Sequence, residues 1–97
     1  MTLTEAKEVL RVDNTENDYL IQSLVDSIAG YIELTTGMSE DDQDNEPMCQ
    51  TVGGFLLTLW YYGDHTDDIK LTRTINNLLK TISLKVVKQS NQESSES

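Results

Sequence analysis

The feature that most constrains the fold is one long amphipathic run in the first half of the chain. Thr15 and Asp18 have the spacing of a helix start, and Glu16 adds negative charge where the helix dipole favours it. Gly37 readily adopts the left-handed conformation that ends many helices. The run therefore predicts a helix over about residues 16–36. Its apolar face has the i, i+3, i+4, i+7 spacing and comprises Leu20, Ile21, Leu24, Val25, Ile28, Tyr31, Ile32 and Thr35.

Three further helices are predicted from their start signals and their periodicity. Thr2 and Glu5 have the reciprocal spacing of a capping box ahead of a short first helix. Pro47 suits the first turn of an apolar helix, and Thr72 has the residue type of an N-cap for the last one. We therefore expect an all-α fold, a small bundle of about four helices over residues 3–11, 16–36, 48–62 and 72–83.

The remaining segments define a single domain. A chain of 97 residues with 37% hydrophobic content can bury one modest core, so one helical domain is expected over residues 1–88. Residues 38–46 are rich in carboxylates and predict a solvated acidic loop. Residues 89–97, rich in Ser, Gln and Glu, predict a disordered tail. The stretch 84–88 fits either a continued helix or an extended arm.

The predicted helix over 48–62 is apolar on more than one face. Its apolar side chains form one stripe and a second set that points in another direction. A helical domain of this size seldom buries both faces of one helix. The helix is therefore either central in the bundle or packed against another subunit. Leu57 belongs to the second set. We expect core or subunit contacts from six residues: Val52, Phe55, Leu56, Leu59, Trp60 and Tyr61.

The charge of the chain is unevenly placed. The formal net charge is −10, yet residues 1–48 carry 12 acidic and 2 basic side chains, while residues 49–97 carry 5 of each. Such a chain lacks the net positive face that a tight grip on DNA requires. The locally basic last helix is expected to contact a neighbouring subunit or another protein, through Arg73, Lys80, Lys85 and Lys88.

Catalytic, metal and cofactor motifs are not found in the sequence. The alternating acids from Asp42 onward match the start of an EF-hand loop, but Pro47 and Gly53 stand where that loop needs Gly and Glu. His65 is expected in an exposed turn, and Cys49 is expected to act as a small, half-buried apolar residue. We expect no enzyme, no metal and no cofactor. Without an apolar run of 18 residues or a leader, the chain is expected to be soluble and without a membrane partner.

Four short motifs follow one another in a distinctive order. They are Leu10-Arg11-Val12-Asp13, Thr36-Gly37, Trp60-Tyr61 and Leu78-Leu79. In that order and spacing, residues 2–83 resemble the small head-tail connector proteins of tailed bacteriophages, also called head completion or adaptor proteins. In this family similar motifs close the first three helices and lie on the last. The chain departs from the family where Tyr62-Gly63-Asp64 replaces a continuation with Asn and Arg.

The resemblance implies an all-α structural protein of the virion. Such a subunit forms a homo-oligomeric ring, twelve-fold when on the portal protein, and continues the channel towards a downstream stopper or tail protein. A neighbouring subunit or the portal is then the expected partner of Arg73, Lys80, Lys85 and Lys88. Genomic DNA passes through the lumen without sequence-specific binding. The implied location is the head-tail interface of the virion, reached from the host cytoplasm during assembly.

The acidic composition has two readings. A negative channel wall would repel phosphate and let DNA slide, whereas the simpler alternative is that the acids keep the free subunit soluble. Two other function classes stay open. One is a small DNA-packaging or regulatory factor that binds nucleic acid through the basic C-terminal stretch. The other is a helical adaptor that binds one host or phage protein without forming a ring.

Overall fold

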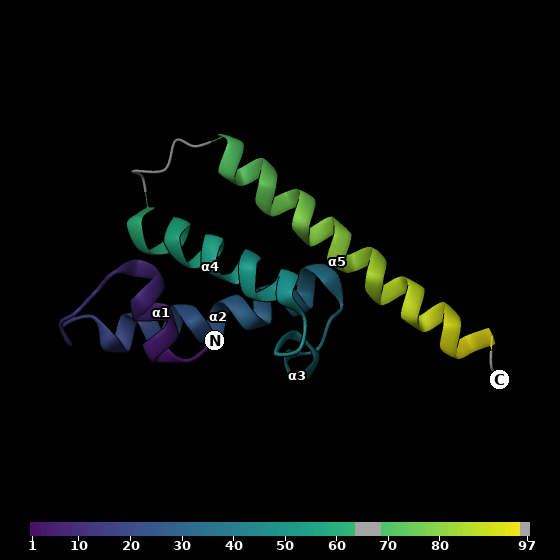
Figure 1. Cartoon of the computed structure of the whole chain (residues 1–97), viewed down its shortest axis with the longest axis horizontal. Coiled ribbons are helices and arrows are strands. Elements are labelled where there is room, and N and C mark those ends of the chain that lie inside the picture. Colours follow the sequence, from purple (N-terminus) through teal and green to yellow (C-terminus); the bar gives the residue numbers. More distant parts are fainter. Residues whose placement is uncertain (64–68, 96–97) are drawn as a thin grey trace.

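The fold is an all-α bundle, as the sequence predicts. A computed structural model describes residues 1–63 and 69–95, with side chains up to residue 89, and these residues contain no strand (Figure 1). The helices in this part of the chain are α1 (Leu3–Leu10), α2 (Asp18–Thr36), α3 (Glu40–Gln43), α4 (Pro47–Tyr62) and α5 (Ile69–Ser95).

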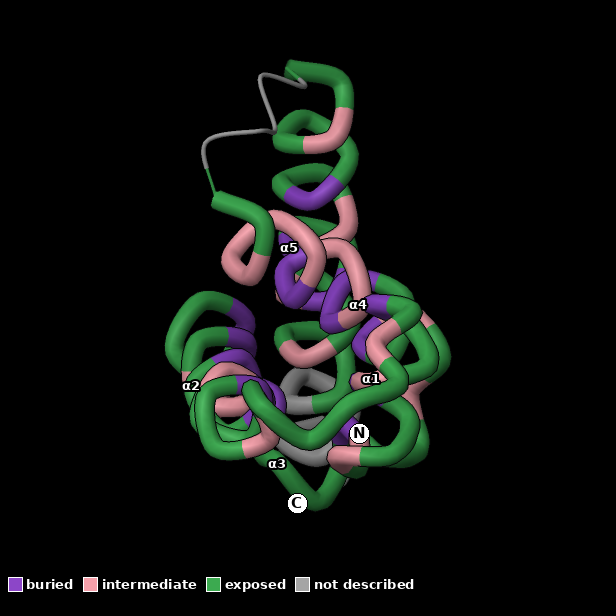
Figure 2. The backbone as a smooth tube through the Cα atoms, turned by 90° about the vertical axis from the view of Figure 1, so that its left-hand side faces the viewer, coloured by how far each residue is buried: buried purple, intermediate pink, exposed green. Residues whose placement is uncertain are grey.

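Helices α2 and α4 form the centre of the bundle. They pack against each other, and α1 and α5 each pack against both. Figure 2 shows the buried stretches of the helices turned towards this common interior. The core is therefore a single one, formed by Ala6, Leu10, Ile21, Val25, Ile28, Ile32, Met38, Cys49, Val52, Leu56, Leu57, Ile75, Leu79 and Ile82.

The first helix begins as predicted and ends on an unusual residue. The Thr2 hydroxyl accepts from the Glu5 amide while the Glu5 carboxylate accepts from the Thr2 amide, which is the complete capping box. At the other end Arg11 adopts the left-handed conformation, with φ 59° and ψ 44°. The amides of Arg11 and Val12 donate to the carbonyls of Glu8 and Lys7, so the end is a Schellman motif without glycine.

Helix α2 confirms the amphipathic run but starts two residues later than expected. Asn17 precedes the helix without a side-chain cap, so the prediction of a cap at Thr15 is wrong. Lys7 Nζ lies 2.8 Å from Asp18 Oδ1 and ties the first turn of α2 to α1. At the other end Gly37 has φ 84°, as the stop signal predicts.

The acidic loop expected at 38–46 contains a short helix, which corrects that prediction. The Ser39 hydroxyl accepts from the Asp42 amide and starts α3. Gln43 is 6% exposed, and its side-chain amide donates to the carbonyls of Ala29 and Met38 at 3.0 Å. The segment is ordered because one buried amide ties it to α2, although its carboxylates remain in solvent.

The last helix is much longer than the predicted 72–83. It begins at Ile69, so Thr72 lies inside it and is not its cap, and it continues to Ser95. The stretch 84–88 is thus a continued helix, and the disordered tail expected from residue 89 is helical as far as Ser95. The predicted turn at 64–68 with His65, and residues 96–97, lie outside the described residues. Helix α4 begins one residue earlier than expected, at Pro47.

Candidate interaction surfaces

The C-terminal end of α4 joins three other segments through its aromatic residues. The Tyr62 hydroxyl donates to the Leu10 carbonyl at 2.7 Å, so the residue that follows the Trp60-Tyr61 motif meets the motif that closes α1. Asn17 Nδ2 donates to the Tyr61 hydroxyl at 2.9 Å, which holds the residue before α2. The Trp60 ring packs edge-on against Tyr31 with the ring centroids 5.4 Å apart. These contacts therefore fix α1 and α2 relative to α4.

Helix α4 is the central helix that its two apolar faces suggest, since it packs against each of the other four helices. Leu57, placed apart from the main stripe by the sequence, is fully buried. Of the six predicted core or interface residues, Val52 and Leu56 are buried. The other four, Phe55, Leu59, Trp60 and Tyr61, are partly buried against the core.

Apolar side chains also lie on the outside of the bundle. Tyr19 and Leu34 on α2 are each 88% exposed. On α5, Leu84 and Val87 are 61% and 53% exposed. These positions fall outside the buried face of their helices, and only the packing of the whole bundle shows which apolar residues are left over.

The four predicted basic contact residues lie on α5 and differ in their surroundings. Lys85 Nζ donates to Glu46 Oε1 at 2.7 Å, so this lysine already has a partner within the chain. The hydrogen bond from Lys85, together with one from the Met48 amide, lowers the pKa of Glu46. Arg73, Lys80 and Lys88 are exposed and make no ion pair among the described residues.

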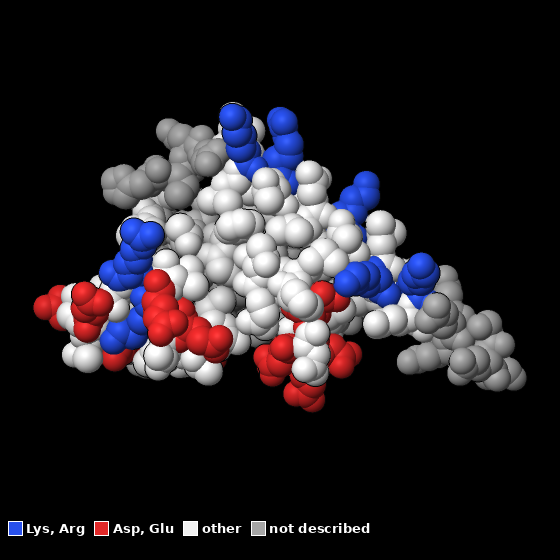
Figure 3. Space-filling view, in the orientation of Figure 1, with Lys and Arg blue, Asp and Glu red and all other residues white. Residues whose placement is uncertain are grey.

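Basic and acidic side chains are unevenly distributed over the surface of the molecule. In Figure 3 the basic side chains of α5 lie along the upper edge and towards its C-terminal end, and the acidic side chains gather along the lower edge. The lower groups belong to the first half of the chain, which carries 12 of the 17 acidic residues. The subunit is therefore strongly polarised as well as negatively charged overall.

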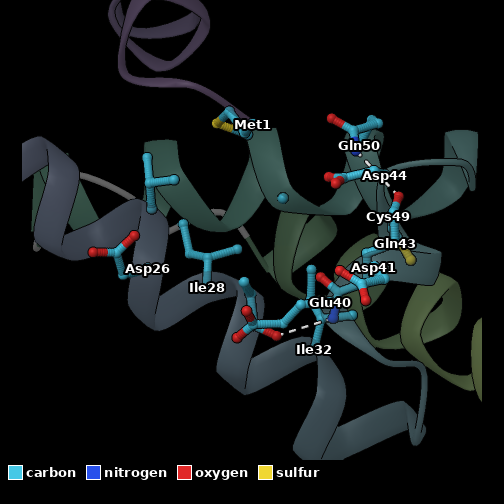
Figure 4. Close-up of a pocket in the computed structure, with 13 residues that line it drawn as sticks. Met1, Asp26, Ile28, Ile32, Glu40, Asp41, Gln43, Asp44, Cys49 and Gln50 are labelled. Atoms are coloured by element: carbon cyan, nitrogen blue, oxygen red, sulfur yellow. Dashed lines mark hydrogen bonds between the residues drawn. The ribbon is translucent and has the colours of Figure 1, made fainter.

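A pocket of about 370 Å³ opens between α2, α3 and α4, and we call it the acidic pocket (Figure 4). Its apolar lining includes the buried side chains of Ile28, Ile32 and Cys49. Burial, with a smaller effect from the charge of Glu46, raises the pKa of the Cys49 thiol to about 11. The thiol is thus neutral at ordinary pH and behaves as an apolar wall. The carboxylates that line the pocket belong to Asp26, Glu40, Asp41 and Asp44.

Sequence reasoning did not find this pocket, because its walls come from separate helices. Asp26 on α2 lies at one end, and the acids of α3 and its C-cap lie at the other (Figure 4). The described side chains include no group of three or more His, Cys, Asp or Glu that could hold a metal ion. Within the same part of the chain, no helix is both long and apolar enough to cross a membrane.

Comparison with known proteins gives one match. A family model described as phage gp6-like head-tail connector protein matches residues 1–97, the whole chain. Neither the curated proteins nor the solved structures contain a match.

Proposed function

Since the chain belongs to the phage gp6-like head-tail connector family, we propose that it is a virion protein that forms a ring on the portal and extends the DNA channel towards the tail. The single observation that carries this proposal is the family match over all 97 residues. The proposed partners are further copies of the chain, twelve of them on the portal, then the portal protein and a downstream stopper or tail protein. The proposed role is structural and needs no catalytic residue or cofactor.

The surface of the subunit is suited to assembly. Leu34 on α2 and Leu84 on α5 are large apolar residues that the described chain leaves exposed. Contacts between subunits would bury both side chains. The opposite charges of the two edges would orient each subunit relative to its neighbour (Figure 3).

The proposed channel wall is acidic. Glu5, Glu8, Asp13 and Glu16 are exposed at the end of the subunit where α1 leads into α2. A ring that turned this end inwards would repel the phosphates of the passing genome, so that DNA slides without sticking. If instead a ring structure showed Arg73, Lys80 and Lys88 lining the lumen, this part of the proposal would be wrong.

The first experiment is native mass spectrometry over a concentration series, alone and with the portal protein of the same phage, with negative-stain images of large species. Annular particles of uniform size, or a defined number of copies bound to each portal, would support the proposal. A chain that stays monomeric at every concentration and does not bind the portal would refute it and favour the adaptor that forms no ring.

A DNA-binding factor is the second candidate, and the basic edge formed by α5 favours it. Its test is fluorescence anisotropy with a short DNA duplex at low and high salt. Binding by counterion release weakens steeply as salt rises, so salt-sensitive binding of the free subunit would support this alternative. No binding at low salt would remove it.

A further inference from the structure

A strip on the outer side of α5 combines apolar and basic side chains. Lys80 is followed after four, seven and eight residues by Leu84, Val87 and Lys88. The four side chains therefore share one helix face. All four are exposed, in contrast to Ile75, Leu79 and Ile82, which are buried in the bundle. We call these four residues the outer strip.

The outer strip has the pattern of a helix that docks into a groove. Two aliphatic side chains lie between two lysines, which is how an amphipathic helix presents anchors to an apolar groove with an acidic border. The described part of the chain covers neither Leu84 nor Val87, which are 61% and 53% exposed. What fits this strip is an apolar cavity lined by carboxylates.

The acidic pocket has this chemistry. Ile28 and Ile32 give it an apolar lining, and Asp41 and Asp44 are among its exposed carboxylates. Its volume of about 370 Å³ lies at the lower end of the range of ligand pockets, which suits one or two aliphatic side chains. Lysines beside those anchors would reach the carboxylates while their stems stay on apolar surface.

A chain cannot fill its own pocket with its own outer strip. Helix α5 packs against α2 and α4 through its buried face, which leaves the outer strip turned away from the bundle. Among the described residues α5 forms an ion pair with the acidic segment only through Lys85, which pairs with Glu46, and not through the four residues of the outer strip. Contact between the outer strip and the acidic pocket therefore requires a second copy, arranged head to tail.

We propose that the outer strip of one subunit docks into the acidic pocket of the next, with Leu84 and Val87 inside and Lys80 and Lys88 paired with the carboxylates. This inference rests on the proposed ring, for which it names the two contacting surfaces. A head-to-tail contact of this kind closes into a ring when its rotation permits.

The test is a charge exchange in the full-length chain. One variant carries Lys80→Glu and Lys88→Glu, a second carries Asp41→Lys and Asp44→Lys, and a third combines all four substitutions. Circular dichroism checks that each folds, and sedimentation equilibrium measures self-association. We expect each double variant to raise the dissociation constant more than tenfold. The combined variant should regain most of the affinity, because its opposite charges meet again with the signs exchanged.

A matched control separates this pairing from an effect of net charge. The variant with Glu8→Lys and Asp13→Lys changes the net charge as much as the pocket variant does, but at the far end of the subunit. We expect it to associate like the wild type. A 1:1 mixture of the strip variant with the pocket variant should also assemble, since each supplies the surface that the other needs.

The outcomes separate this inference from the proposed function. Rings whose stability is unchanged in both double variants would overturn the inference and leave the connector proposal intact. Loss of assembly that the combined variant fails to restore would overturn the pairing of these two surfaces. Loss of portal binding with unchanged self-association would assign the outer strip to the portal and also overturn it. A wild-type chain that remains monomeric, alone and with the portal, would overturn both proposals.

Discussion

The Tyr62 hydroxyl donates a hydrogen bond of 2.7 Å to the main-chain carbonyl of Leu10, 52 residues earlier in the chain. Leu10 is the last residue of α1 and Tyr62 is the last residue of α4. The carbonyls of the last helical turn have no partner within their own helix, and this bond supplies one from a distant element. The C-terminal ends of two helices are thus joined in space.

Replacing Tyr62 by Phe tests the contribution of this bond. The substitution removes only the hydroxyl, and a single hydrogen bond contributes about 0.5–1.5 kcal/mol to stability. We expect the free energy of unfolding to fall by about 1 kcal/mol in urea denaturation. The control is Tyr19→Phe, because Tyr19 is 88% exposed and the loss of its hydroxyl should leave the free energy of unfolding unchanged. An equal effect of the two substitutions would contradict a role for the bond.

Replacing Arg11 by Gly is expected to stabilise the protein. Arg11 has φ 59°, a conformation in which a residue with a Cβ is strained and glycine is not. We expect a gain of about 1 kcal/mol, measured as a higher urea midpoint with an unchanged slope. Arg11→Ala should show no such gain, since it keeps the Cβ. If glycine instead destabilised the chain, contacts of the arginine side chain would outweigh the relief of strain.

Leu57 and Leu59 lie two residues apart on α4 and should respond differently to truncation. Leu57 is fully buried, whereas Leu59 is only partly buried against the core. Leu57→Ala is expected to cost about 2–5 kcal/mol through lost burial and the cavity left behind. Leu59→Ala should cost clearly less. Thermal melts of both variants in one buffer compare them, and a larger effect at Leu59 would contradict the described packing.

The Glu46 and Lys85 pair should make stability depend on acid pH. In the folded chain the pKa of Glu46 lies below its ordinary value of 4.5. The ionised carboxylate therefore stabilises the fold above that value, and this contribution is lost as the pH falls through the folded-state pKa. Its size is small because Lys85 is 44% exposed, and exposed pairs contribute about 0.2–1 kcal/mol.

Urea midpoints from pH 3 to pH 7 measure this contribution. Glu46→Gln should lower stability near pH 7 and converge with the wild type at low pH. Lys85→Met should do the same. Lys88→Met serves as the control, because Lys88 makes no ion pair among the described residues. A difference between Glu46→Gln and the wild type that persisted at pH 3 would rule out charge as its cause.

Cys49 should weaken the fold at alkaline pH. Burial raises the pKa of its thiol from 9.0 to about 11, so the unfolded chain ionises first as the pH rises. Ionisation favours the unfolded state between those two values, and stability falls over that window. Cys49→Ala should lose this part of the alkaline decline. Denaturation at pH 8, 9 and 10 makes the comparison, and parallel curves for the two proteins would contradict a buried neutral thiol.

Periodicity and local capping signals predicted those features of the fold that depend on residues close together in the sequence. Of the eight residues predicted on the apolar face of α2, four are in the core, namely Ile21, Val25, Ile28 and Ile32. Three others are exposed, namely Leu20, Tyr31 and Thr35. The capping box at Thr2 and the stop at Gly37 were also readable, because each depends on residues within one turn. Of the motifs that carry the resemblance, Thr36-Gly37 is one of these helix ends.

The features that the sequence did not reveal depend on distant partners. The order of α3 depends on Gln43, whose amide reaches the Ala29 carbonyl 14 residues earlier. Lys85 meets Glu46 across 39 residues of sequence. The acidic pocket has Asp26 and Glu40 on different helices. Composition assigned the acidic segment to a solvated loop, because it counts residues without knowing that Gln43 finds partners in α2 and at Met38.

The separation of charge onto two edges has a consequence for how the subunit meets any charged object. Net charge alone predicts that a protein with charge −10 keeps away from an anionic surface. With the basic residues of α5 gathered on one edge, the molecule experiences a torque as it approaches, and it arrives with that helix foremost. On a cation-exchange resin at low salt it should be retained by this edge, despite an isoelectric point near 4.2. The subunit is therefore oriented before it touches a charged surface, and it makes first contact in a narrow range of orientations.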